Sequence, residues 1–168
     1  MTEPLIHLVC GATGAGKTTY AIKLAGEIGA MRYSIDEWMT TLYWMDSPDP
    51  IEYDWAMERI GRCEQQIWSL ALAQAQIDKP SVLDLGLTKK SHRAKFAALA
   101  DESSLAFQLH FLDLPAEERW ERVAERNREK GETYRLDVSR ENFDFVEGLW
   151  ERPGAEEIRA LNGIRIAD

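Results

Sequence analysis

The sequence predicts an α/β fold in which helices cover both faces of a parallel sheet. Short apolar segments alternate with longer segments of helical periodicity, and this alternation is typical of parallel strands joined by crossover helices. A glycine-rich turn follows the first apolar segment, and a helix follows that turn directly. A length of 168 residues without repeats or low-complexity tracts indicates a single domain over residues 1–168.

Five segments have the length and apolar character of strands. They are residues 4–10, 31–35, 80–85, 105–112 and 164–166. Apolar residues that recur every three to four positions predict helices between them. These helices are residues 17–28, 50–78, 89–100, 115–130 and 139–150. Asp49, Pro50 and Glu52 have the residue types expected for the N-cap, first position and third position of the second helix.

The turn after the first strand fits the phosphate-binding pattern G-x-x-x-x-G-K-[ST] without a mismatch. It consists of Gly11, Ala12, Thr13, Gly14, Ala15, Gly16, Lys17 and Thr18, and Thr19 follows. Small residues let backbone N–H groups approach a polyphosphate, and the next helix adds its N-terminal dipole. We expect Lys17 to bind the β- and γ-phosphates and the Thr18 hydroxyl to coordinate Mg²⁺. The pattern and its flanking elements predict a triphosphate site.

Acidic residues follow strands whose carboxyl ends should lie beside this turn. Asp36 follows the second strand and is our first choice for the base that takes a proton from a phosphoryl acceptor. Its position also allows a plain helix N-cap. Asp84 ends the third strand, where it would either hold the Mg²⁺ shell or close a turn. Asp113 precedes Leu-Pro after the fourth strand, and we assign it a capping or turn role.

Three arginines form one stripe on the helix after the fourth strand. Arg119, Arg122 and Arg126 recur at helical spacing, and guanidinium groups can stabilise the charge of a transferring γ-phosphoryl group. The alternative is a solvated face on which Glu118 pairs with Arg122. Arg93, near the start of the helix after the third strand, is a further candidate for a phosphate contact.

Aromatic residues gather after the second strand, at Trp38, Tyr43, Trp44, Tyr53 and Trp55. Such residues usually fill a core. Their position just beyond the candidate base also allows them to form a wall of an acceptor pocket. The sequence leaves both interpretations open.

The composition and net charge indicate which kind of binding partner and which cellular compartment to expect. The net charge of −9 argues against a broad nucleic-acid surface and favours a small-molecule acceptor. No apolar run has the length of a membrane span, and the N-terminus lacks the features of a signal peptide. We therefore expect a cytoplasmic protein, as a monomer or homodimer. Cys10 and Cys63 are expected in the core, and the histidines show no metal-ligand spacing.

The chain resembles the P-loop kinases grouped with zeta toxins, chloramphenicol phosphotransferase and phage polynucleotide kinase. It is most similar to small bacterial proteins described as AAA family ATPases or predicted kinases. The resemblance covers nearly the whole chain and rests on a few segments. They are residues 11–19, 34–38, 83–86 with Arg93, 119–123 with Arg126 and Asn127, and 142–145.

This resemblance implies a P-loop NTPase fold of three α/β/α layers, similar to nucleotide kinases, with a five-stranded parallel sheet. It implies a small helical lid at about residues 126–140, with lid arginines Arg122 and Arg126. ATP and Mg²⁺ would be the cosubstrates, and Asp36 would be the base. The acceptor-binding insertions of characterised members do not align with this chain, so the resemblance does not identify the acceptor.

We expect a phosphotransferase that moves the γ-phosphoryl group of ATP to a hydroxyl of a small molecule. Three alternatives stay open: a polynucleotide 5′-hydroxyl kinase, a zeta-toxin-like nucleotide-sugar kinase, and an ATPase or nucleotide switch that acts on a protein. The acidic charge argues against the first. The Asn-Lys-x-Asp signature of GTPase switches is absent.

Overall fold

The computed structural model describes residues 3–86, 89–131 and 137–167. Five strands form one sheet in the order β2-β3-β1-β4-β5, and all neighbouring strands are parallel. The strands are β1 (Ile6–Gly11), β2 (Met31–Ser34), β3 (Ser81–Asp84), β4 (Phe107–Leu112) and β5 (Ile164–Ile166). The predicted α/β class and five-stranded parallel sheet are confirmed.

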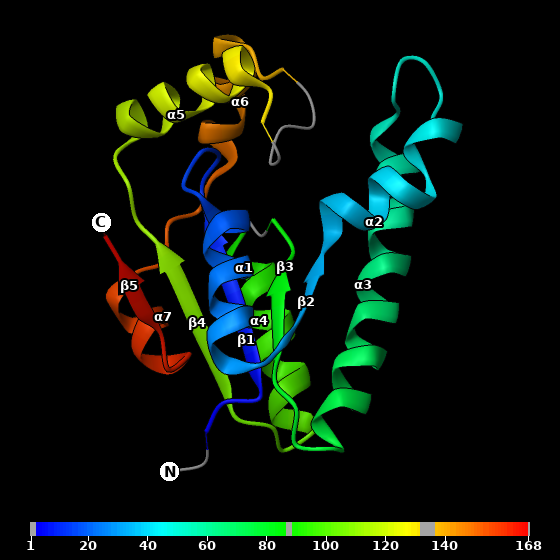
Figure 1. Ribbon diagram of the computed structural model, residues 1–168, viewed down its shortest axis with the longest axis vertical. Helices are drawn as coiled ribbons and strands as arrows, with labels where there is room; N and C mark the ends of the chain where they lie inside the picture. The colour runs from blue at the N-terminus through cyan, green and yellow to red at the C-terminus, as the bar shows by residue number, and fades with distance from the viewer. Residues whose placement is uncertain (1–2, 87–88, 132–136, 168) are drawn as a thin grey trace.

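Helices join the strands and extend beyond the carboxyl edge of the sheet (Figure 1). They are α1 (Lys17–Ile28), α2 (Ile35–Leu42), α3 (Tyr53–Ala75), α4 (Lys90–Glu102), α5 (Ala116–Glu129), α6 (Arg140–Leu149) and α7 (Ala155–Ala160), with a 3₁₀ turn at Trp44–Asp46. The short helix α7 was not expected from the sequence, because its six residues carry too few periodic positions to stand out.

The predicted start of the second helix is wrong. Helix α3 begins at Tyr53, and the Glu52 side chain makes no capping hydrogen bond. Residues 47–52 instead form a loop between the 3₁₀ turn and α3. The Trp44 and Trp55 rings stack at 5.9 Å and join the two ends of this loop. A contact between aromatic residues eleven positions apart therefore outweighs the local capping pattern.

Side-chain alternation along the strands divides the core between the two faces of the sheet. Ile6, Leu8 and Cys10 of β1 pack in a cluster with residues of α3 and α4. Val9 packs on the opposite face in a second cluster with α1. Figure 1 shows α1 and α4 on opposite sides of the sheet. Cys10 and Cys63 are buried free thiols, as predicted.

Strand register brings the candidate site residues to one edge of the sheet. Gly11 pairs with Leu112, and Ser34 pairs with Asp84, at the carboxyl ends of their strands. Helices α5 and α6 lie beyond this edge in Figure 1. The glycine-rich turn, the start of α2 and the end of β3 therefore all lie at the edge of the sheet beyond which this helical pair lies.

The lid predicted at residues 126–140 lies only partly within the described residues, because 132–136 are outside them. The described part consists of the end of α5 and the approach to α6. The Asn127 side chain donates to the Val138 carbonyl oxygen at 2.8 Å and accepts from the Val138 N–H at 3.1 Å. This double contact ties the two ends of the connection together. Lid movement stays a prediction.

Among the described residues, no helix combines the length and the apolar character that crossing a membrane would require.

Candidate nucleotide and phosphoryl-transfer site

The glycine-rich loop leads into α1 without a side chain that caps the N–H groups at the start of the helix. Gly14 and Gly16 have φ angles of 79° and 85°, in the left-handed region that glycine enters at little cost. Gly16 is also the N-cap of α1 and has no side chain to bond the first N–H groups of the helix. Those N–H groups are therefore available to an anion.

The two glycines meet different surroundings. A Cβ atom on Gly14 would lie 2.5 Å from the Arg119 carbonyl oxygen and 2.8 Å from Val123. At Gly16 the nearest atom within 4 Å would be Arg122 Nη1, at 3.7 Å. Gly14 thus lets α5 pack against the loop, whereas Gly16 faces the space where a ligand would bind. The sequence predicted a ligand-binding role for both.

A cavity of about 330 Å³ holds most of the predicted chemical groups. It is lined by Thr13, Gly14, Gly16, Lys17, Thr18, Thr19, Asp36, Asp84, Gly86, Arg126 and Val146. Lys17 Nζ donates to the Ala12 carbonyl oxygen at 3.2 Å. Burial lowers the pKa of Lys17, and the carboxylates of Asp84 and Asp36 oppose this decrease. The two carboxylates favour the protonated form of Lys17, and its ammonium group supplies the positive charge that a bound phosphate needs.

Asp84 lines this cavity and has two neighbours that favour its ionised form. The Thr18 hydroxyl lies close enough to the Asp84 carboxyl to lower its pKa, and Arg32 Nη1 donates to Asp84 Oδ2 at 3.3 Å. Burial raises the pKa of the Asp84 carboxyl, while Lys17 and Arg32 oppose that rise. A hydroxyl and a carboxylate oxygen close together are suitable Mg²⁺ ligands, so the residues present fit the predicted metal.

Arg32 is a site neighbour that sequence reasoning missed. It also forms an ion pair with Glu37 of α2, so it connects the end of β3 to the first turn of α2. The available signal was strand alternation. Arg32 precedes Ser34 by two residues on the same face of β2, and Ser34 pairs with Asp84.

Asp36 lies in the first turn of α2, and its position settles the capping alternative. Ser34 is the N-cap of α2, and its hydroxyl accepts from the Glu37 N–H at 3.3 Å. The alternative in which Asp36 caps this helix is therefore wrong. Asp36 is exposed and lines the cavity together with Lys17 and Asp84. The structure thus brings the predicted base and the predicted phosphate-binding lysine to one cavity.

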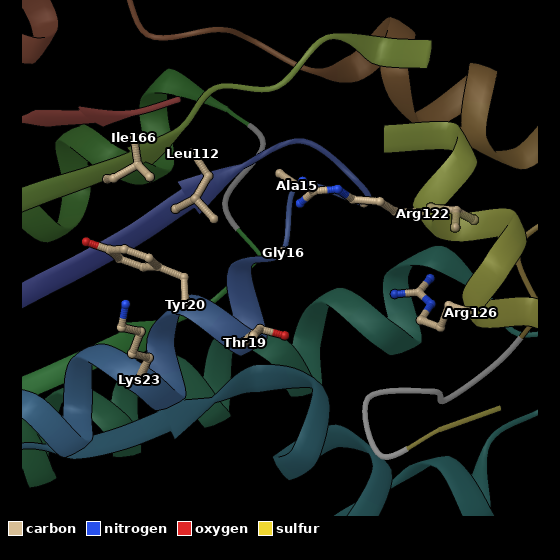
Figure 2. Close-up of a pocket in the computed structure, with 11 residues that line it drawn as sticks. Ala15, Gly16, Thr19, Tyr20, Lys23, Leu112, Arg122, Arg126 and Ile166 are labelled. Atoms are coloured by element: carbon tan, nitrogen blue, oxygen red, sulfur yellow. The ribbon is translucent and has the colours of Figure 1, made fainter. Parts of the chain in front are cut away.

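A second cavity, of about 400 Å³, lies between α1 and α5. Figure 2 shows Tyr20, Leu112 and Ile166 at one end of it, and Arg122 and Arg126 extending from α5 at the other end. Arg126 lines both cavities. Its Nε is buried and has no hydrogen-bond partner among the described residues. A buried donor without a partner indicates a group that a ligand can satisfy.

Arg119 shares a stripe with these arginines but has a different environment. It is 4% exposed, and its guanidinium pairs with Glu147 of α6. It also donates to the Thr13 carbonyl oxygen at 3.1 Å and to the Leu114 carbonyl oxygen at 2.9 Å. Arg119 therefore holds the loop, α5 and α6 together.

The predicted phosphate contact of Arg93 has no support in the structure. Arg93 is fully buried, and its guanidinium pairs with Glu157 of α7. It also lies 5.7 Å from the centre of the Trp150 ring. Arg93 is not among the described residues that line either cavity. Its position joins α4 to α7, and α7 is the helix that the sequence did not predict.

The aromatic residues after β2 are mainly packing residues. Trp38, Tyr43 and Trp44 pack at the border of the larger core cluster, which confirms the core interpretation for these three. Trp55 lies under the Arg59 guanidinium at 4.1 Å. Tyr53 is 72% exposed. Among the described residues, no aromatic side chain of this group lines either cavity.

Comparison with known proteins agrees with this arrangement. The AAA domain family matches residues 6–148. The chain belongs to this family. The matched range of this AAA domain spans the glycine-rich loop, Asp36, Asp84, α5 and most of α6. A search of curated proteins finds no match.

Solved structures with the same fold include several kinases. A gluconokinase from Sinorhizobium meliloti is 17% identical, with a TM-score of 0.67, and the match covers 97% of this chain and 82% of that one. A sugar kinase from a Janibacter species is 17% identical, with a TM-score of 0.63, covering 98% of this chain and 85% of that one. Kti12 from Chaetomium thermophilum, in complex with ADP-AlF3, is 17% identical, with a TM-score of 0.59, and the match covers 96% of this chain and 88% of that one. The AAA domain described here therefore has a P-loop kinase-like fold.

Proposed function

We propose that this protein is an ATP- and Mg²⁺-dependent kinase that transfers the γ-phosphoryl group to a hydroxyl of a small molecule. The observation that carries the proposal is the position of Asp36 in one cavity with Lys17, Thr18 and Asp84. A protein that only binds ATP needs no carboxylate on the acceptor side. A kinase needs one to orient and deprotonate the hydroxyl.

The two cavities offer places for the two ends of ATP. The nucleoside would occupy the end lined by Tyr20, Leu112 and Ile166, where the surface is largely apolar. The phosphates would follow the loop from Gly16 toward Lys17. Arg126 lines both cavities, so its guanidinium is placed to contact the phosphate chain as it passes from one to the other.

The proposed transfer step uses side chains that line the same cavity. The Asp36 carboxylate takes the hydroxyl proton as the acceptor oxygen bonds to the γ-phosphorus, and the bond from that phosphorus to the β,γ-bridging oxygen breaks. Lys17 and Arg126 offset the charge that shifts to the leaving phosphate. Mg²⁺, held by Thr18 and Asp84, would neutralise charge on the β- and γ-phosphates.

Support for a small acceptor comes from charge and from fold. The net charge of −9 disfavours a long polyanion as substrate. Two proteins of the same fold are a sugar kinase and a gluconokinase. Sugars and sugar acids are therefore the first acceptors to test.

The test is a screen with γ-labelled ATP over sugars, sugar acids, nucleosides, nucleotide sugars and a 5′-hydroxyl oligonucleotide. We expect label transfer to a small hydroxyl compound. Transfer to the oligonucleotide alone would favour the polynucleotide kinase alternative. Release of labelled phosphate that no acceptor changes would indicate an ATPase.

Variants then separate binding from transfer. Asp36→Asn should keep ATP affinity and lose transfer by about a hundredfold or more. Lys17→Ala should weaken ATP binding itself, because it removes the cation at the β- and γ-phosphates. Asp46→Asn is the matched control, since Asp46 is an exposed carboxylate beyond α2 that does not line the cavity. Normal transfer by Asp36→Asn would show that Asp36 is not the base.

A further inference from the structure

A third cavity, of about 380 Å³, lies on the other side of the connection between β4 and α5. It is lined by Asp113, Leu114, Pro115, Ala116, Arg119, Glu147, Trp150, Arg152 and Arg165. Within the described residues it shares no lining residue with the two cavities of the proposed kinase site. Arg165 and Ile166 are neighbours on β5 and point to opposite faces of the sheet. Since Ile166 lines the nucleoside cavity, this third cavity lies on the opposite face.

The cavity is lined by more positively charged side chains than negatively charged ones. It is lined by three guanidinium groups and two carboxylates. Arg119 and Glu147 form one complete pair. Arg152 and Arg165 both pair with the same carboxylate, Asp113. Their hydrogen bonds hold the pKa of Asp113 below its ordinary value, so the carboxylate stays ionised and one positive charge remains in excess.

Donors remain available on the two arginines that share Asp113. A guanidinium carries five N–H groups. Arg152 donates to Asp113 through Nε and Nη2, and Arg165 donates through Nε. Both side chains are about half exposed, at 56% and 57%, so their other N–H groups can reach a ligand. This arrangement suits a small oxyanion, because guanidinium groups bind carboxylate and phosphate oxygens through paired donors.

Two further features of the cavity fit an anion. The approach to α5 lines it, at Leu114 and Pro115, together with the first helical residue, Ala116. The N-cap, Pro115, offers no side-chain hydrogen bond, so no cap side chain occupies the N–H groups at the start of this 14-residue helix, although its first turn also carries Glu117 and Glu118. Arg119 forms part of the wall and also donates to the Thr13 carbonyl oxygen of the glycine-rich loop. A ligand here would lie one side chain away from the kinase site.

We propose that this third cavity is a second anion site, which binds the phosphate or carboxylate group of a small molecule. It differs from the glycine-rich loop in its recognition chemistry. The loop presents backbone N–H groups and Lys17, whereas the third cavity presents Arg152 and Arg165. The proposal does not depend on the kinase reaction.

The test uses inorganic phosphate as the probe and isothermal titration calorimetry as the measurement. Inorganic phosphate can also bind the glycine-rich loop, so the titrations are made in the Lys17→Ala protein, where that site is weakened. We expect this protein to bind phosphate still. Adding Arg165→Gln should weaken the remaining binding by tenfold or more, because it removes the excess charge and leaves Asp113 paired with Arg152. Adding Asp113→Asn instead should tighten binding several-fold.

Arg159→Gln is the matched control, since Arg159 is an exposed arginine of α7 that does not line the cavity. It should leave phosphate binding unchanged. Thermal melts show which variants are folded and can be compared. Parallel titrations with acetate distinguish a carboxylate ligand from a phosphate ligand. The proposal is overturned if Lys17→Ala binds neither anion, or if Arg165→Gln and Asp113→Asn both titrate like their parent.

Discussion

Asp36 and Arg126 line the cavity beside the glycine-rich loop, whereas Arg119 near the start of α5 and two histidines of the sheet are hydrogen-bonded to other groups of the protein. Arg126 has a buried Nε without a partner among the described residues, but Arg119, about two turns earlier on the same helix, is bonded to Glu147 and to backbone carbonyl groups. Buried polar groups are costly unless they are paired. The comparison of Arg119 with Arg126 thus distinguishes side chains that hold the fold together from side chains that are available to a ligand.

The sheet region also contains a chain of hydrogen bonds between side chains. His7 Nε2 donates to the Pro4 carbonyl oxygen at 3.0 Å, so His7 Nδ1 accepts from His110 Nε2 at 2.9 Å. His110 Nδ1 then accepts from the Tyr20 hydroxyl at 2.8 Å. Each neutral imidazole donates once and accepts once. Hydrogen bonds to Pro4, Tyr20 and each other thus account for the ring nitrogens of both histidines.

The two loop glycines offer the sharpest test of this comparison. Gly14→Ala should lower the free energy of unfolding by roughly 3 kcal/mol, because it combines a left-handed residue with overpacking against α5. Gly16→Ala should cost only about 1 kcal/mol, since its added Cβ atom meets no backbone. Urea denaturation measures both values. Equal losses of stability would show that Gly14 and Gly16 do not differ in how closely the rest of the protein surrounds them.

Two arginines of α5 provide the next test. Arg119→Ala should lower the free energy of unfolding by roughly 2 to 3 kcal/mol, because Glu147 loses its buried partner while keeping some solvent contact. Arg126→Ala should change it by less than about 1 kcal/mol and slow phosphoryl transfer by about tenfold or more. The measurements are urea denaturation and turnover at saturating ATP. The opposite pattern would show that their roles are exchanged.

The histidine chain predicts a pH dependence of stability. Burial lowers the pKa of His7 and lowers that of His110 to about 4, against an ordinary value of 6.5. Between the folded and unfolded pKa values, the unfolded chain binds protons that the folded chain does not bind. The free energy of unfolding therefore falls as the pH drops from 6.5 toward 4. We expect a loss of about 2 kcal/mol between pH 7 and pH 5.

The measurement is urea denaturation at a series of pH values, and the control is a protein carrying His7→Gln and His110→Gln. Its stability should be lower at pH 7 and change less with pH over this range. If it shows the same slope as the parent protein, other groups control the pH dependence.

Local pattern was enough to predict the part of the site that depends on neighbouring residues. Gly14, Gly16 and Lys17 belong to one turn whose geometry follows from its own residues. The rule that parallel strands bring their carboxyl ends together then placed Asp36 and Asp84 beside that turn. The start of α3 was wrong, because the contact that sets it joins Trp44 to Trp55 across a loop.

The sequence by itself determined the parallel sheet, the glycine-rich loop and the edge at which the site lies, because each follows from short-range periodicity or spacing. Only the tertiary structure decided what each arginine does. Arg93, Arg119 and Arg126 are the same residue type, and each lies on a helix that follows a strand of the sheet. Whether it meets Glu157, Glu147 or an open cavity depends on helices that pack against it from distant parts of the chain.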